Sequence, residues 1–239
     1  MAPSVDAADV IRRVRSDKLT YLNNRCLHDL AAAVQDTETV GRDGMIIEAG
    51  TALGGSAIVM AVLKSANRPL RVYDAFDMIP PPTDKDGDDV HRRYARITAG
   101  KSKGIGGTTY YGYRDDLLAE VTASFERYGV PPGTHHIELV KGYFDGTLHI
   151  DEPVALAHLD ADWYESTMTC LQRIEPHLVT DGRLVIDDYY TWSGCKRAVE
   201  DYFRRRTGYE FVKLGRLHIG KRADARKLHW WQRTKPWPE

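Results

Sequence analysis

Two short apolar segments of the chain each end in a pair of aspartates, and this repeated pattern limits what the chain can fold into. The segments and their acidic ends are Val154–Leu159 followed by Asp160-Ala161-Asp162, and Gly182–Ile186 followed by Asp187-Asp188. Apolar runs of this length fit buried strands of a parallel sheet, and ligands bind beyond the carboxyl ends of such strands. If the two strands are neighbours, the four carboxylates converge and repel one another, unless a divalent cation or substrate hydroxyls lie between them.

Each aspartate taken alone has a plainer interpretation. Asp162 is followed three residues later by Glu165, which is the spacing of a helix capping box. Asp187 and Asp188 could be solvated loop residues. Two acidic pairs at two successive strand ends favour a reacting centre over these alternatives.

Length and composition limit the class of protein to which the chain can belong. The chain has 239 residues, 42% of them hydrophobic and 28% charged, which suits one large α/β domain over residues 1–239. Its net charge of -1 argues against a nucleic-acid partner. Three cysteines without a CxxC pair predict neither a disulfide framework nor a zinc site, and a reducing cytoplasm fits. No apolar run approaches membrane-spanning length, so no membrane partner is expected.

A glycine-rich turn follows the first predicted strand, Met45–Ala49, and leads into a helix over Ala57–Ser65. The turn and its preceding acid supply Glu48, Ala49, Gly50, Thr51, Gly54 and Ser56 as candidate cofactor-binding residues. Glycines let a ligand approach the backbone, and a helix N-terminus offers free N–H groups. The next strand, Leu70–Tyr73, ends at Asp74, which is placed to accept hydrogen bonds from a ribose. Together these features favour an adenosine-containing cofactor over a purely structural turn.

The alternation of strand and helix patterns predicts an α/β fold with a seven-stranded, mostly parallel sheet and an antiparallel last strand. Further helices are expected over Ser16–Gln35, Arg114–Tyr128, Trp163–Leu178 and Gly194–Thr207, and further strands over Ile137–Val140, Glu210–Leu214 and Leu228–Gln232. The first of these helices belongs to an N-terminal helical segment, residues 1–40. The basic connection between the last two strands, Gly215–Lys227, is expected to be a solvated face.

Residues 78–113, here named the lid, interrupt this alternation with a stretch rich in Pro, Gly and Asp. A connection this long inside a compact domain is typically a lid or binding loop. Partial matches to a phosphate-binding loop and to a calcium loop both fail, because Ala95 stands where each needs another residue. His158, two residues before Asp160, is interpreted as a hydrogen-bonded core histidine in preference to a metal ligand.

The chain resembles the magnesium- and S-adenosylmethionine-dependent O-methyltransferases of antibiotic sugars, a TylF-like family that includes macrocin, mycinamicin and novobiocin-pathway enzymes. The segments that carry the resemblance are Tyr21–Asn24, Ile47–Thr51, Gly54–Ser56, Tyr73–Phe76, Arg127–Gly129, Lys141–Phe144, Leu159–Tyr164 and Ile186–Tyr189. The resemblance implies a Rossmann-like class I methyltransferase fold, with Mg²⁺ held by Asp160, Asp187 and Asp188. It also implies Asp162 as the general base. Its cofactor site comprises the glycine turn and Asp74, with Gly142, Tyr143 and Asp160.

The expected reaction is methylation of a sugar hydroxyl, on a small-molecule sugar or a glycosylated natural product, by a cytoplasmic homodimer. A catechol or phenol O-methyltransferase is the main alternative, but its usual lysine base falls here at Trp163. A metal-dependent hydrolase leaves the glycine turn and Asp74 unexplained. A non-catalytic binding module leaves Asp162 unexplained. The sequence does not identify the acceptor.

Overall fold

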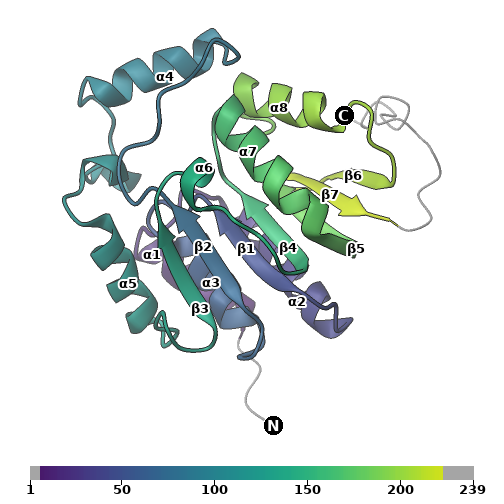
Figure 1. The fold of residues 1–239 in the computed structure, drawn as a ribbon. Coiled ribbons are helices and arrows are strands. Elements are labelled where there is room, and N and C mark those ends of the chain that lie inside the picture. The colour runs from purple at the N-terminus through teal and green to yellow at the C-terminus, as the bar shows by residue number, and fades with distance from the viewer. Residues whose placement is uncertain (1–5, 223–239) are drawn as a thin grey trace.

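The structure, a computed structural model, describes residues 6–222 and forms one sheet with helices on both faces (Figure 1). The strands are β1 (Met45–Ala49), β2 (Leu70–Asp74), β3 (Ile137–Lys141), β4 (Val154–Leu159), β5 (Leu178–Ile186), β6 (Tyr209–Lys213) and β7 (Leu217–Lys221). The helices are α1 (Ala7–Ser16), α2 (Asn24–Thr39), α3 (Gly55–Leu63), α4 (Asp88–Thr98), α5 (Leu117–Arg127), α6 (Phe144–Thr147), α7 (Tyr164–Ile174) and α8 (Ser193–Phe203), with short 3-10 turns η1 (Ile105–Gly107), η2 (Tyr111–Tyr113) and η3 (Glu175–His177).

The strand order is β3-β2-β1-β4-β5-β7-β6, and β7 runs antiparallel to both of its neighbours. This confirms the predicted seven-stranded, mostly parallel sheet with an antiparallel last strand. The strands that precede the aspartate pairs, β4 and β5, lie side by side, with Leu159 opposite Ile186. In the part of the chain that the structure describes, no helix is long and apolar enough to cross a membrane.

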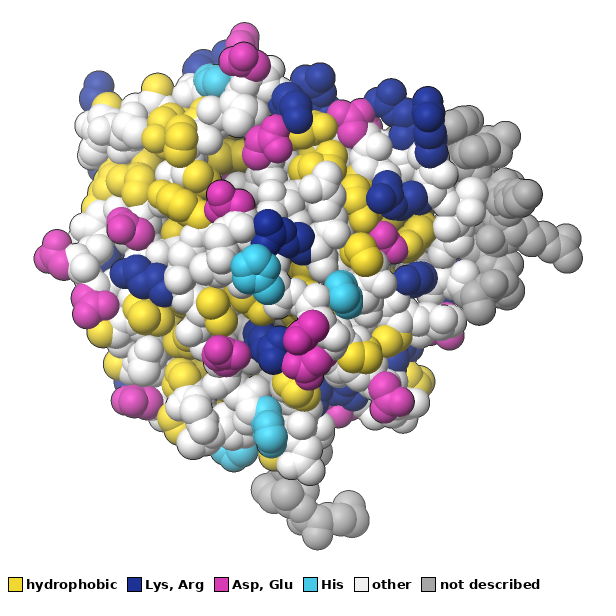
Figure 2. All heavy atoms as spheres, viewed as in Figure 1, with side chains coloured by type: hydrophobic (Ala, Val, Ile, Leu, Met, Phe, Trp, Pro, Cys, Tyr) yellow, Lys and Arg dark blue, Asp and Glu magenta, His cyan; other side chains and the backbone are white. Residues whose placement is uncertain are grey.

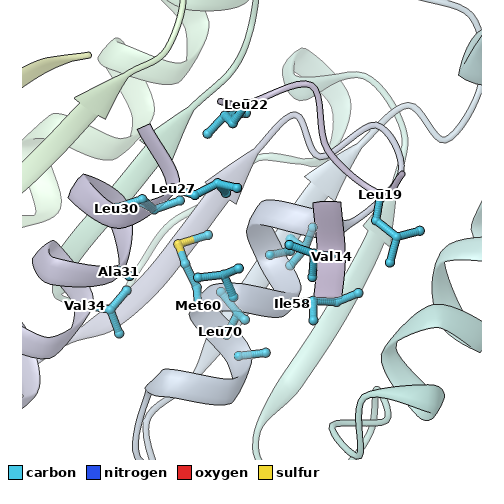
Figure 3. Packing of buried hydrophobic residues seen from close by; sticks show 14 of the residues in the cluster. Val14, Leu19, Leu22, Leu27, Leu30, Ala31, Val34, Ile58, Met60 and Leu70 are labelled. Atoms are coloured by element: carbon cyan, nitrogen blue, oxygen red, sulfur yellow. The ribbon is translucent and has the colours of Figure 1, made fainter. Parts of the chain in front are cut away.

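Alternate residues along the strands point to opposite faces of the sheet and pack into two apolar layers. One layer joins α1, α2, α3 and α5 to the sheet, and the other joins α7 and α8 to its opposite face. Figure 3 shows part of the first layer, where Leu27, Leu30 and Met60 point toward one another. Because both faces are covered at the centre of the sheet, β1 and β4 are buried along their whole length.

The N-terminal helix prediction is wrong in its bounds. The structure has two helices, α1 and α2, separated by a linker over residues 17–23 that includes Lys18 with a φ of 58°. Asn23 ends the linker, and its side chain accepts a hydrogen bond from the backbone N–H of Cys26, which is the typical geometry of a helix N-cap. Leu19 and Leu22 have the spacing of a helix, but both lie in the linker, and their side chains are buried in the core.

Two further predictions also need correction. The lid was expected to be a loop, yet it contains α4 and two 3-10 turns. The basic connection Gly215–Lys227 was expected to be solvated, yet β7 forms within it, because Leu217 and Ile219 alternate toward the buried face. The predicted strand Glu210–Leu214 corresponds to β6, whereas Leu228–Gln232 lies outside the described residues.

The junction of β1 and β4 requires a glycine at position 50. Gly50 has a φ of +89°, and a Cβ added there would lie 1.9 Å from the carbonyl oxygen of Asp160. The backbone N–H of Asp160 also donates to the carbonyl of Ala49 at 2.8 Å. The missing side chain therefore allows the ends of the two strands to meet directly.

We predict that Gly50→Ala destabilises the protein by at least about 3 kcal/mol, the sum of left-handed backbone strain and steric overlap. Gly129→Ala is the matched control, because Gly129 has a φ of +75° but no atom within 4 Å of an added Cβ. It should cost only the backbone term, about 1–2 kcal/mol. Urea unfolding measures both, and equal losses would show that the close approach to Asp160 is unimportant.

Candidate active site

Four carboxylates meet where β4 and β5 end. Ligand oxygens of Asp160, Asp187 and Asp188 lie within 4.8 Å of one another. Asp187 and Asp188 are each only 5% exposed. Asp162 is tied to the same cluster, since its backbone N–H donates to Asp188 Oδ2 at 3.2 Å. The structure thus brings together all four acids that the sequence singled out.

The charges of this cluster are strongly perturbed. Burial, followed by repulsion from neighbouring carboxylates, raises the pKa values of Asp160 and Asp162 well above the ordinary range, and raises the pKa of Asp188 to about 7. Asp187 differs, because His158 and Arg216 outweigh its burial and lower its pKa. The protein's own cations therefore do not stabilise four ionised carboxylates at this spacing, and such a set of carboxylate oxygens fits a hard divalent cation.

Two cations, His158 and Arg216, lie against Asp187. Arg216 Nε donates to Asp187 Oδ1 at 2.6 Å. His158 is fully buried between Glu48, whose Oε1 is 3.0 Å from Nδ1, and Asp187, whose Oδ1 is 3.6 Å from Nε2. Although burial lowers it, contact with Asp187 and Glu48 raises the pKa of His158 to about 9. His158 is thus a buried, partnered histidine, as its sequence position suggested.

Arg216 was missed by the sequence analysis because it lies in the connection that was expected to be solvated. It sits in the turn between β6 and β7, next to Gly215, and two side chains of α2 hold that turn. Asp29 Oδ2 accepts the N–H of Gly215 at 2.5 Å, and Cys26 Sγ lies 3.5 Å from the Gly215 carbonyl. A single arginine in a basic segment carries no sequence signal that would separate it from its solvated neighbours.

The glycine turn is held from beneath by two acids. Glu48 Oε2 accepts the hydroxyl hydrogen of Thr51 at 2.7 Å. Asp74 Oδ2 accepts the N–H groups of Thr51 and Ala52 at 2.7 and 3.0 Å. Glu48 therefore links the glycine turn to His158, and through His158 to the carboxylate cluster.

Two cavities meet at the cluster. The larger, of about 470 Å³, is lined by predicted cofactor residues, namely Gly50, Asp74, Gly142, Tyr143 and Asp160. The smaller, of about 250 Å³, is lined by Asp187 and Asp188 and by five aromatic residues, Tyr21, Tyr110, Tyr111, Trp163 and Trp192. Asp160 and Asp162 line both cavities. The predicted residues Glu48, Ala49, Thr51, Gly54 and Ser56 are buried behind the turn and line neither cavity.

The larger cavity has an apolar side. Ile79, Pro80 and Pro81 line it from the lid, and Tyr143 and Phe144 line it from the start of α6. In Figure 2 hydrophobic side chains gather on the viewed face between α4 and α6. Such a surface suits the flat, apolar faces of a nucleobase.

Asp162 does not cap α7. The N-cap residue is Trp163, and Glu165 pairs with Lys85 at 2.8 Å, so the capping-box interpretation is wrong. Asp162 has a φ of +53°, which is an uncommon conformation for a residue other than glycine and is concentrated at functional sites. Its carboxylate is therefore not used to cap α7, and Asp162 lines both cavities.

Comparison with known proteins adds independent findings. A profile of the family described as "Macrocin-O-methyltransferase (TylF)" matches residues 13–211. The 8-demethyl-8-(2,3-dimethoxy-alpha-L-rhamnosyl)-tetracenomycin-C 4'-O-methyltransferase of Streptomyces olivaceus is 31% identical over 189 residues, which is 77% of this chain and 67% of that protein. Demethyldecarbamoylnovobiocin O-methyltransferase of Streptomyces niveus is 26% identical over 193 residues, with the same coverage of 77% and 67%.

Solved structures share the fold. The O-methyltransferase NovP superposes with a TM-score of 0.68 at 21% identity, covering 85% of this chain and 81% of that chain. The calicheamicin methyltransferase CalS11 superposes with a TM-score of 0.59 at 15% identity, covering 89% of this chain and 91% of that chain.

The raised pKa values give a pH prediction for metal-free protein in chelator. Asp188 has a folded-state pKa of about 7 against an ordinary value of 3.8. Protonation therefore favours the folded state, and this contribution is absent above pH 7 and grows as the pH falls toward 4. Asp160→Asn removes one carboxyl group whose ionisation the folded state disfavours, so at pH 8 the variant should be more stable than the parent, by on the order of 1 kcal/mol.

On going from pH 8 to pH 5, the parent should gain more stability than Asp160→Asn does, because less repulsion remains in the variant. Adding Mg²⁺ at pH 8 should reverse the order of stability. Urea unfolding at the two pH values measures the difference in unfolding free energy between parent and variant. Groups far from the cluster titrate alike in both proteins, so their contributions cancel in this difference. A parent that is already the more stable protein at pH 8 in chelator would contradict this electrostatic account.

Proposed function

Because the chain belongs to the macrocin O-methyltransferase (TylF) family, and is therefore an O-methyltransferase, we propose that it moves a methyl group from S-adenosylmethionine to a sugar hydroxyl. The observation that carries the proposal is the meeting of two cavities at Asp160 and Asp162. A methyl donor in one cavity and an acceptor in the other would face each other there, beside the carboxylate cluster.

The larger cavity is proposed as the cofactor chamber. Gly50, Asp74, Gly142 and Tyr143 all line it. In this proposal Gly50 would bring backbone close to the ligand, Asp74 would face the ribose, and Gly142 and Tyr143 would border the adenine. When bound, S-adenosylmethionine supplies a methyl group that its sulfonium already activates. The protein must therefore activate the acceptor, whose hydroxyl is hardly ionised near neutral pH.

Asp160, Asp187 and Asp188 are proposed to hold Mg²⁺. This ion, when bound, would lower the pKa of a coordinated acceptor hydroxyl and fix its direction. Arg216 and His158 keep Asp187 ionised by occupying its Oδ1 side, which leaves its other oxygen for the ion. Asp162 takes the proton from the acceptor hydroxyl, a contribution of order 10²–10⁴ in rate for a positioned base.

The smaller cavity is proposed as the acceptor chamber. Its volume of about 250 Å³ suits one sugar ring, and its aromatic walls suit the apolar faces of a sugar and of an attached group. The tetracenomycin relative is named for a compound that carries a rhamnosyl group, and the second relative is named for a novobiocin derivative. We therefore propose a sugar of a glycosylated natural product as the acceptor class. The single-domain assignment, the homodimer and the cytoplasmic location stay predictions.

Calorimetric titration tests the cofactor assignment directly. S-adenosylmethionine and S-adenosylhomocysteine should bind to the protein, whereas ATP and NAD should not. Binding of ATP or NAD with comparable affinity would overturn the assignment, since the chamber would then recognise adenosine alone.

The metal and base roles should separate by mutation. Asp187→Asn should weaken Mg²⁺ binding, and excess Mg²⁺ should restore part of the activity by mass action. Asp162→Asn should bind Mg²⁺ and S-adenosylhomocysteine nearly as well as the parent, yet turn over at least ~10²-fold more slowly. Chelator should abolish the activity of the parent.

Asp43→Asn is the control, because Asp43 is an exposed carboxylate that precedes β1, at the opposite end of the sheet. It should leave both binding and turnover unchanged. If Asp162→Asn keeps near-normal turnover, the base lies elsewhere, and His158 and the tyrosines of the lid become the candidates.

A further inference from the structure

The two helices that follow the carboxylate-bearing strands cannot cap themselves. The N-cap residues of α7 and α8 are Trp163 and Trp192, and neither provides a side-chain cap hydrogen bond. Tryptophan has no side-chain oxygen to accept the free N–H groups of a first helical turn. The cap must therefore come from another part of the chain.

Both caps come from the lid. Asp86 Oδ1 accepts the N–H of Tyr164, the first residue of α7, at 2.8 Å. Asp89 Oδ2 accepts the N–H of Ser193, the first residue of α8, at 2.9 Å, and Asp89 Oδ1 accepts the Ser193 hydroxyl hydrogen. Two aspartates three positions apart in one lid segment thus cap two different helices.

The lid segment with Asp86 and Asp89 lies very close to the first turns of α7 and α8. Asp86 is only 7% exposed, and its second oxygen accepts the N–H of Thr83 at 2.9 Å. A Cβ at Gly194 would lie 1.9 Å from Asp86 Oδ1, and a Cβ at Gly87 would lie 2.4 Å from Ser193 Oγ. Glycines at both positions therefore make room for the caps.

Other contacts fasten the same lid segment to the same helices. Trp163 Nε1 donates to the carbonyl of Pro80 at 2.9 Å, and Arg197 Nη1 donates to the carbonyl of Lys85 at 3.1 Å. In Figure 1, α4 stands away from the sheet and one end of it approaches α8. The early part of the lid is thus an anchor, and not the wholly loop-like segment expected from its composition.

The capped helix ends lie next to the reacting carboxylates. Asp162 precedes Tyr164 by two residues, and its N–H bonds to Asp188. The backbone N–H groups of Thr191 and Trp192, just before α8, both donate to the carbonyl of Asp188 at 2.9 Å. A shift of either helix start would therefore move the carboxylates that hold the ion and take the proton.

The later part of the lid forms a wall of the smaller cavity through Arg93, Ile97, Tyr110 and Tyr111. The same segment that would contact the acceptor is thus joined, through two aspartates, to the turns that carry the carboxylates.

We propose that Asp86 and Asp89 are positioning residues, which cap α7 and α8 from the lid and so make the geometry of the carboxylate cluster depend on lid docking. This inference rests on the proposed function for the roles of the four carboxylates. It concerns how those groups are held, and it can be tested without an acceptor.

The test compares Asp89→Ala with Asp89→Asn and Asp88→Ala. Asp89→Ala should speed amide hydrogen exchange at Ser193 by about two- to thirty-fold, the range expected for losing one N-cap. In the presence of S-adenosylhomocysteine it should also weaken Mg²⁺ binding, measured by calorimetry, by at least ~3-fold. Asp89→Asn keeps an acceptor for the Ser193 N–H and a donor for its hydroxyl, so it should stay close to the parent in both measurements.

Asp88→Ala is the matched control, because it removes the same charge from the adjacent residue. The Asp88 side chain is 93% exposed and pairs only distantly with Arg92, at 3.9 Å. It should change neither the exchange at Ser193 nor Mg²⁺ binding. Asp86→Ala should repeat the Asp89→Ala pattern at Tyr164, and the Asp89 series still decides the question if the buried Asp86 variant fails to fold.

Faster exchange at Ser193 with unchanged Mg²⁺ binding would overturn the proposal, because the cap would then stabilise α8 without positioning the cluster. Equal weakening in Asp88→Ala would also overturn it, since lost lid charge alone would then explain the effect. Failure of the parent to bind Mg²⁺ at all would instead count against the proposed function.

Discussion

Mutual repulsion among the buried carboxylates at the ends of β4 and β5 is the constraint on which the rest of this structure depends. Parallel neighbours bring Asp160, Asp187 and Asp188 within 4.8 Å, and burial removes the water that would screen them. Two cations offset part of that repulsion at Asp187: the turn before β7 supplies Arg216, and the interior of β4 supplies His158. The lid fixes the starts of the two helices that follow the acidic turns. A divalent cation completes the balance in the proposed mechanism.

The sheet order explains why the site lies where it does. The order reverses between β1 and β4, which leaves a crevice at their carboxyl ends where ligands of open α/β sheets bind. Gly50 and Asp160 meet in that crevice, so the cofactor turn and the first acidic turn touch directly. Glu48 and His158 connect the same two turns from within the sheet. The proposed cofactor site and the proposed cation site therefore share one set of buried polar contacts.

Much of this could be predicted from the sequence, because buried parallel strands and glycine turns follow from local patterns. The seven-stranded sheet, the convergence of the four aspartates and the buried partnering of His158 were all predictable in this way. The predictions were wrong where contacts between distant parts of the chain determine the local structure. Leu19 and Leu22 match helical spacing, but they lie in a linker and pack into the core from there. The strand β7 forms because it pairs with β5 on one side and with β6 on the other. The acidic run Asp84–Asp89 resembled a solvated loop, since its caps act on helices about eighty to one hundred residues away. Arg216 and the aspartate caps are contacts between distant segments, which no local pattern records.

The most direct test of the central claim is a crystal structure with S-adenosylhomocysteine and with Mn²⁺ in place of Mg²⁺, located by its anomalous scattering. The account predicts one strong peak bonded to oxygens of Asp160, Asp187 and Asp188, at about 2.0–2.4 Å, with open positions toward the smaller cavity. The ligand should fill the larger cavity and end beside Asp162. A cluster that stays free of Mn²⁺ while the ligand is bound, or a peak held by other residues, would contradict it.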